Sequence, residues 1–270
     1  GSASGDITLT GTTTALDQVT MTTASGSING SGLVTSDTVS LNASSGIGNT
    51  TGVTLSSSNI TADTTTGDVE IANSLGTAVI VLSLTTGTGT ISFDQSGGGD
   101  LSAVTVSASG AVALANSAGA ISLVGTVVGG SLDATATGAI TDGSNGDLAI
   151  AGLAEFTAGS IELGNDAGNT TNFGTLTFSS AGSVTISEDS SLDLVGTNTA
   201  GSADLNSTAG VSDAGAVSVN VAGLLDVSGT SVALGSGASV FNTGTLTFSS
   251  AGSVTISEAS SLVVVGINTA

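Results

Sequence analysis

The chain of 270 residues contains no Lys, Arg, His, Cys, Pro, Trp or Tyr. Without His and Cys it cannot build a Ser-His-Asp or Cys-His nucleophile, or an ordinary zinc, copper, haem or iron–sulfur site. Without Lys and Arg it has no Schiff-base amine and no guanidinium group to hold a phosphate or a carboxylate. These absences leave carboxylates, hydroxyls and amides as the groups that could do chemistry.

Charge is also scarce and of one sign, because 21 acidic residues give a formal net charge of −21. Nucleic-acid binding depends on neutralising phosphates with Lys and Arg, so nucleic acid is excluded as a partner, and an anionic membrane surface would repel the chain. The longest apolar stretch, AVIVLSL at 78–84, is far shorter than the roughly 20 residues of a membrane-spanning helix. The chain begins at Gly1 without a signal peptide, so we expect a processed chain or a segment of a longer one.

Short segments of alternating apolar and polar residues fill the sequence. DITLTG, TVSLNA, TISFDQ, AVALAN and SVTISE are examples, and they are rich in Val, Ile, Leu and Thr. Turn clusters such as SGGGD and DGSNGD separate them. The segments recur every ~9–12 residues, which is typical of all-β proteins. The pattern therefore predicts an all-β fold without helices of significant length.

The sequence also repeats itself. GTLTFSSAGSVTISE occurs at 174–188 and again at 244–258, and 23 of 27 positions match between 174–200 and 244–270. The four differences are Asp189/Ala259, Asp193/Val263, Leu194/Val264 and Thr197/Ile267. Weaker similarity on either side extends the two repeat units to residues 138–209 and 210–270. The apolar skeleton is kept while acidic residues change, so the repeat preserves a building unit of the fold.

Self-similarity of this kind favours a solenoid, because each coil must stack on a copy of itself. We expect one elongated β-solenoid over 1–270, a right-handed parallel β-helix of roughly 12 coils of about 20–24 residues, with adjacent coils ~4.8 Å apart. One repeat unit would then be three coils, with Phe178 and Phe248 in equivalent places. Outward Thr and Ser would form ladders, and Gly and Asn would form the corners.

Several phrases resemble the repeat regions of filamentous-haemagglutinin-like bacterial exoproteins, adhesins of the two-partner-secretion type. They are VSLNASSGIG (39–48), ADTTTGDVEIANSLGTAV (62–79), TTGTGTISFDQSGGGDL (85–101) and GTLTFSSAGSVTISEDSS (174–191). The resemblance covers essentially the whole chain and implies a right-handed β-helix shaft. The family's secretion domain carries Asn-Pro motifs, which a chain without Pro cannot contain, so the resemblance is to the shaft alone.

The two ends of the sequence match in repeat register. The first copy continues Asn198-Thr199-Ala200-Gly201-Ser202-Ala203, whereas the chain ends Asn268-Thr269-Ala270 and begins Gly1-Ser2-Ala3. One interpretation is a subunit or segment whose last coil stacks on the first coil of the next. The other is a chance match in a sequence rich in Gly and Ser. On the first interpretation the partners are copies of the chain, or flanking repeats of a longer one.

The acidic residues are the only candidates for a metal site. Asp68 with Glu70, Asp142 with Asp147, and Glu188 with Asp189 could offer oxygen ligands to loosely bound Ca²⁺. Against this, Asp189 and Asp193 are lost in the second copy, and SGGGDL at 96–101 is one partial copy of a calcium-binding repeat that needs several. The alternative is a set of solvated turn carboxylates that keep the protein soluble. We expect no other cofactor.

The sequence favours a structural protein over an enzyme. A polysaccharide-cleaving β-helix needs facing carboxylates and sugar-stacking aromatics, and the chain has only six Phe. We therefore expect no catalytic residues and an extracellular shaft of a bacterial surface fibre, adhesin or biofilm filament. The alternatives are a solenoid that binds a glycan, mineral or ice surface through its side, or a cation-binding matrix protein. A chain without Lys and Arg offers trypsin-like proteases no cleavage site, which suits an extracellular location.

Overall fold

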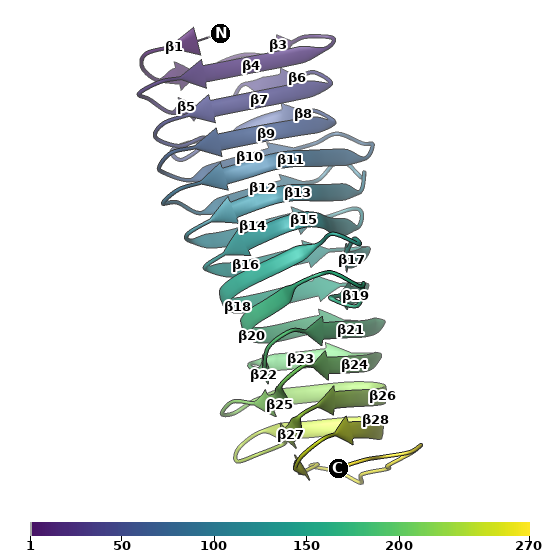
Figure 1. The fold of residues 1–270 in the computed structure, drawn as a ribbon. Coiled ribbons are helices and arrows are strands. Elements are labelled where there is room, and N and C mark those ends of the chain that lie inside the picture. Colours follow the sequence, from purple (N-terminus) through teal and green to yellow (C-terminus); the bar gives the residue numbers. More distant parts are fainter. Residues whose placement is uncertain (1) are drawn as a thin grey trace. The chain divides into compact units, whose positions relative to one another are not determined.

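The structure is a computed structural model that describes residues 2–270, and within that range it contains strands and turns but no helix (Figure 1). The packing divides the chain into two units, residues 1–138 and 139–270. Each unit is described by itself. No helix in the described range is long and apolar enough to span a membrane.

The first unit contains sixteen short strands, joined by turns of Gly, Ser, Thr and Asp. They are β1 (Ser2–Ala3), β2 (Ile7–Thr8), β3 (Thr13–Thr14), β4 (Gln18–Thr23), β5 (Ile28–Asn29), β6 (Leu33–Thr35), β7 (Thr38–Ala43), β8 (Val53–Ser56), β9 (Asn59–Thr64), β10 (Val69–Asn73), β11 (Val79–Thr86), β12 (Ile91–Gln95), β13 (Leu101–Ala108), β14 (Ala111–Asn116), β15 (Ile121–Gly129) and β16 (Ser131–Ala136).

Strands of this unit pair in parallel with the strand one coil later in the chain. One series runs β4, β7, β9, β11, β13 and β15, and a second runs β6, β8, β10, β12, β14 and β16 (Figure 1). The register places Gln18 opposite Thr38 and Val79 opposite Leu101, so the length of a coil at these places agrees with the prediction. Most backbone N–H groups are therefore committed to the neighbouring coil.

The alternating sequence explains the core, because every second residue of a strand points inward. Val39, Ile60, Val81, Ala103 and Leu123 occupy successive coils of one column, and all five are fully buried. Each large aliphatic side chain buried in this way contributes about 1.5–3 kcal/mol to stability. Stacked like residues thus fill the interior of the coil.

Some inward columns of the first unit are polar. Asn73, Gln95 and Asn116 end three successive strands in the inward phase and are almost fully buried. The Asn73 Nδ2 donates to Gln95 Oε1 at 2.7 Å, and Asn73 also exchanges hydrogen bonds of 3.0 Å with the backbone of Ser57. The amides therefore satisfy backbone groups at a corner where the strand ladder is interrupted.

The second unit contains thirteen strands. They are β17 (Ala139–Asp142), β18 (Asp147–Ala158), β19 (Ser160–Leu163), β20 (Thr171–Ser180), β21 (Ser183–Glu188), β22 (Leu192–Leu194), β23 (Thr197–Ala200), β24 (Ser202–Ser207), β25 (Gly210–Asp213), β26 (Ser218–Gly229), β27 (Ser231–Leu234), β28 (Val240–Ser250) and β29 (Val254–Ile256).

Parallel pairing from coil to coil holds in the second unit as well, with more variation in coil length. Leu148 lies opposite Thr171, whereas Leu176 lies opposite Leu194, a clearly shorter step along the chain. The short step falls below the predicted range. After a corner at Val195 and Gly196, which divides the next coil into β22 and β23, Ser179 lies opposite Thr199 and the step is again within that range. These features confirm the predicted all-β β-solenoid of about 12 coils.

The sequence repeat is longer than three coils, and our expectation on this point is wrong. Three coils after Ser179 the register reaches Asn242, by way of Thr199 and Asn220, and so falls short of Ser249. Ser249 instead lies three coils after Ser187. Phe178 and Phe248, the neighbours of Ser179 and Ser249, therefore stand in different columns, and each copy is displaced by about a third of a coil.

Candidate functional site

Four of the six predicted metal ligands gather around one loop, residues 164–171, in the second unit. Asp142 and Asp147 come from the coil before the loop, and Glu188 and Asp189 follow the strand after it. In the sequence they form two separate pairs, and only the stacking of coils brings the four side chains to one loop and the start of β20. The place is therefore the strongest acidic candidate in the described part of the chain.

Backbone N–H groups of the loop and of β20 donate hydrogen bonds to these carboxylates. The Gly164 N–H donates to Asp142 Oδ2 at 2.7 Å, the Thr170 N–H to Asp147 Oδ1 at 2.9 Å, and the Thr171 N–H to Asp189 Oδ2 at 2.9 Å. The Phe173 N–H donates to Glu188 Oε1 at 2.9 Å. The carboxylates thus replace backbone acceptors at a corner and hold its irregular turns together.

Two of these carboxyl groups are buried, contrary to our interpretation of them as solvated. Asp142 is 7% exposed and Glu188 is 2% exposed. Burial raises the pKa of both, and that of Glu188 reaches about 7 despite hydrogen bonds from Phe173 and Ser190 that lower it. Asp142 Oδ1 and Glu188 Oε2 have no hydrogen-bond partner among the described residues. A proton on either group would relieve the charge without breaking the contacts of the other oxygen.

The second copy repeats this construction. Asp213 Oδ2 accepts the Gly235 N–H at 2.8 Å, as Asp142 accepts that of Gly164, and both glycines have a positive φ, 75° and 72°. Glu258 Oε1 accepts the Thr243 N–H at 3.1 Å, in the manner of Glu188. The pairs Asp142/Asp213 and Glu188/Glu258 are therefore corner caps in both copies, whereas Asp189, which is replaced by Ala259, is exposed.

The other two candidates lie apart from this loop, in the first unit. Asp68 Oδ1 accepts hydrogen bonds from the Thr90 N–H at 2.8 Å and the Thr90 hydroxyl at 3.0 Å, while Glu70 is exposed on β10. Across residues 2–270, no three acidic side chains are grouped so that they could hold a metal ion. The geometry therefore assigns the six residues to capping or to the surface, and calcium binding stays a prediction.

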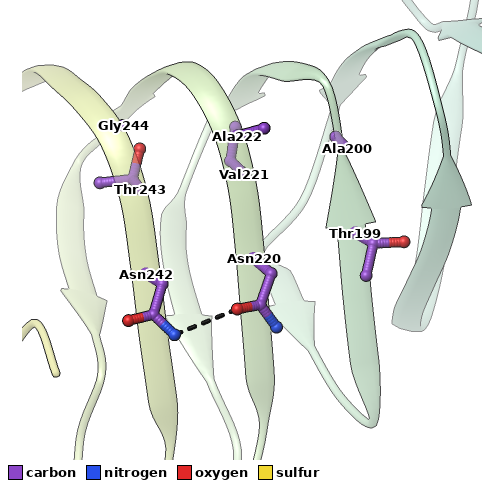
Figure 2. Close-up of a pocket in the computed structure, with 8 residues that line it drawn as sticks. All are labelled: Thr199, Ala200, Asn220, Val221, Ala222, Asn242, Thr243 and Gly244. Carbon is purple, nitrogen blue, oxygen red and sulfur yellow. Dashed lines mark hydrogen bonds between the residues drawn. The ribbon is translucent and has the colours of Figure 1, made fainter. Parts of the chain in front are cut away.

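A shallow hollow of about 350 Å³ lies on the outside of the second unit, beside β23, β26 and β28 (Figure 2). Thr199, Asn220 and Asn242 stand on adjacent strands along one wall, and the Asn242 Nδ2 donates to Asn220 Oδ1 at 3.1 Å (Figure 2). The register shifts between β26 and β28 at this point. Gly244 is required there, because a Cβ would overlap the carbonyl oxygen of Ala222.

The first copy contains the same hollow, with a volume of about 320 Å³. It lies where the register shifts between β18 and β20 and is lined by Ala149, Ile150, Ala151, Asn172, Phe173 and Gly174. Asn172 and Gly174 are the counterparts of Asn242 and Gly244 in the second copy. Sequence reasoning missed these hollows, although the Ala-Gly-Leu triplets at 151–153 and 222–224 mark both register shifts.

Comparison with known proteins gives no relative. No protein-family model, no curated protein and no solved structure matches the chain. The resemblance to filamentous-haemagglutinin-like exoproteins therefore stays a prediction, and the fold and the two sites described above are the basis on which function is inferred.

Proposed function

We propose that the chain is an extracellular structural protein, the β-solenoid shaft of a bacterial surface fibre or adhesin. The observation that carries the proposal is the construction of the stacked coils. In each unit, parallel ladders join one coil to the next, inward side chains fill the interior, and the acidic and amide groups serve the corners. Such a construction transmits force along the stack through many hydrogen bonds and offers no deep cleft for a substrate among the described residues.

The last coil supports stacking. Nearly the same sequence occurs in the first copy of the repeat, and there the next coil lies over it. Leu192 and Leu194 are fully buried beneath the next coil, whereas their counterparts Leu262 and Val264 are 41% and 47% exposed. A further coil would bury these aliphatic side chains, each for about 1.5–3 kcal/mol when burial is complete. That coil is either a following repeat or the first coil of another copy.

The net charge of −21 opposes stacking of copies. Repulsion between like-charged ends weakens as salt shortens the screening length from about 30 Å at 0.01 M to about 8 Å at 0.15 M ionic strength. Assembly from copies of this chain should therefore depend on salt, with longer particles at higher ionic strength. Head-to-tail contacts of this kind do not close into rings when the stacking axis is straight, and they yield filaments.

Electron microscopy and sedimentation of the purified chain over a series of salt and protein concentrations test the proposal. We expect particles that lengthen with both, and fibre diffraction with an axial spacing of ~4.8 Å. Val264→Asp in the uncovered coil should suppress lengthening, because its counterpart Leu194 is buried beneath the next coil, whereas Ile267→Asp should not, because its counterpart Thr197 stays exposed there. Particles of one short length under all conditions would refute end-to-end stacking. Labelling of intact source cells with an antibody against the chain tests its extracellular location.

The duplicated hollow favours a second candidate function, binding of a neutral glycan by the side of the solenoid. Each hollow combines amide groups with apolar side chains and has no charged residue in its lining. A hydroxyl-rich ring could hydrogen-bond to the amides of Asn220 and Asn242 and rest on the exposed Ala222. Titration with neutral oligosaccharides, followed by the side-chain amide signals in NMR, tests this function. Absence of shifts at Asn172, Asn220 and Asn242 would reject it.

A further inference from the structure

The dipeptide Asn-Gly occurs twice in the sequence, as Asn29-Gly30 and Asn145-Gly146. An asparagine followed by glycine is chemically labile, because the backbone nitrogen of the glycine can attack the side-chain carbonyl carbon and no Cβ on the glycine obstructs the approach. The reaction needs a side chain and a backbone that are free to reach the cyclic geometry. The two sites differ in that freedom.

Asn145 lies at the tip of the turn between β17 and β18, and its side chain is exposed and without a hydrogen-bond partner among the described residues. The Gly146 N–H makes one local contact, to the carbonyl oxygen of Gly143 at 2.8 Å. The ends of the turn are fixed, since Asn169 Nδ2 donates to the Gly143 carbonyl at 2.9 Å and Asp147 accepts the Thr170 N–H. The Asn145 side chain is therefore unconstrained, and only the hydrogen bond of the buried Gly146 N–H within the turn must break before attack.

Asn29 is held within the stack of the first unit. Its Oδ1 accepts the Thr50 N–H at 3.1 Å, and the Gly30 N–H donates to the Thr51 carbonyl at 3.3 Å in the neighbouring coil. Gly30 is pressed against the backbone of Leu9 on its other side, where a Cβ would overlap the Leu9 carbonyl oxygen. Attack at this site requires both hydrogen bonds to break, so the coil must first open locally.

We propose that Asn145 is a site of spontaneous covalent modification, whereas Asn29 is protected by the fold. The Gly146 nitrogen forms a bond to the Asn145 Cγ, and water carries the proton from this nitrogen to Nδ2. The Cγ–Nδ2 bond then breaks and releases ammonia. The resulting succinimide adds water at one of its two carbonyls. Ring opening gives aspartate or isoaspartate at position 145, with no oxidant or other reactant required.

The modification changes a corner that already carries acidic groups. Either product adds a carboxylate between Asp142 and Asp147, and isoaspartate lengthens the backbone by one methylene group between anchored ends. The turn is clamped to the 164–171 loop through Asn169 and Thr170. Progressive modification should therefore weaken this corner with time, a consequence that would matter most if the proposed extracellular function holds.

The test incubates the folded chain at mildly alkaline pH and body temperature and follows both sites by peptic digestion and tandem mass spectrometry. Replacement of the amide by a carboxyl group marks the product. Because two hydrogen bonds protect Asn29 and its neighbour, position 145 should react roughly tenfold faster or more. In urea, which unfolds the chain and exposes both sites, the two sites should react at similar rates.

Gly146→Ala should slow the reaction at position 145, and Asn145→Ser should remove the signal there while leaving position 29 unchanged. Circular dichroism at the start of each incubation establishes that the variants are folded. Equal rates at the two sites in the folded chain, a faster reaction at position 29, or no reaction at position 145 would each overturn the proposal.

Discussion

Replacing Glu188 by Gln should abolish much of the pH dependence of folding stability near neutrality. The pKa of Glu188 rises from 4.5 to about 7 in the folded chain, mainly because the carboxyl group is buried. The folded state therefore binds the proton more tightly than the unfolded state. The resulting stability is fully present below pH 4.5, falls as the pH rises through 7, and stays low above that value.

The shift sets an upper limit of about 3 kcal/mol on this effect, and screening by solvent at the corner reduces the expected value to about 1–2 kcal/mol. Gln keeps an oxygen for the Phe173 N–H and is neutral at every pH. Urea unfolding at fixed ionic strength, followed by circular dichroism at pH 5 and pH 8, should show the wild type losing this stability between the two values. The Gln variant should lose much less.

Glu258→Gln provides the matched control, because Glu258 accepts equivalent hydrogen bonds from Thr243 and Ser260 but is only half-buried in an uncovered coil. This variant shows whether a Glu→Gln change at any such corner has the same effect. Burial also raises the pKa of Asp142 and Asp204, so these groups contribute a pH dependence of the same sign. The reasoning is refuted if Glu188→Gln leaves the difference in unfolding free energy between pH 5 and pH 8 as large as in the wild type.

Gly99→Ala should destabilise the chain strongly or prevent folding, since a Cβ there would overlap the backbone of the preceding coil, whereas Gly11→Ala should be near neutral because nothing lies within 4 Å. Asn73→Ala should cost about 2–4 kcal/mol of unfolding free energy by leaving buried partners unpaired, and Asn42→Ala on the exposed side of β7 should cost less than about 0.5 kcal/mol. Phe178→Ala should cost about 3–5 kcal/mol by opening a cavity, and a loss under about 1 kcal/mol would contradict the stacked core. Removal of calcium with a chelator should leave the melting temperature unchanged, because no three acidic side chains among residues 2–270 are grouped so that they could hold an ion. Urea and thermal unfolding measure all of these effects.

The fold could be predicted from sequence because its driving pattern is local. Alternation within segments such as TVSLNA and SVTISE determines which side chains point inward, and the internal repeat favours stacked coils over a sandwich. The same alternation also predicts the burial of two carboxyl groups, contrary to our interpretation of them as solvated. Val184, Ile186 and Glu188 share one inward phase, as do Ile140 and Asp142, so the burial of both carboxyl groups followed from the alternation.

What could not be predicted depends on coil length. To predict that Asp142, Asp147, Glu188 and Asp189 meet at one loop, one must know the number of residues in each coil. These numbers vary from coil to coil in the second unit. The variation arises in turns of Gly, Ser and Asn, where one residue more or less leaves the hydrophobic pattern unchanged. The bulges that form the two hollows are a separate difficulty, because the inward phase changes there, from Phe173 to Leu176 in β20 and from Thr243 to Leu246 in β28.

The mismatch between the sequence repeat and the coil has a consequence for any array built from it. A unit of a whole number of coils would place its copies in a row along one side of the wall. A unit that exceeds three coils by about a third of a coil turns each copy to the next side, so that three successive copies would point in three directions around the axis. Duplication then spreads an identical surface around the circumference, and neighbours approaching from any side would meet it.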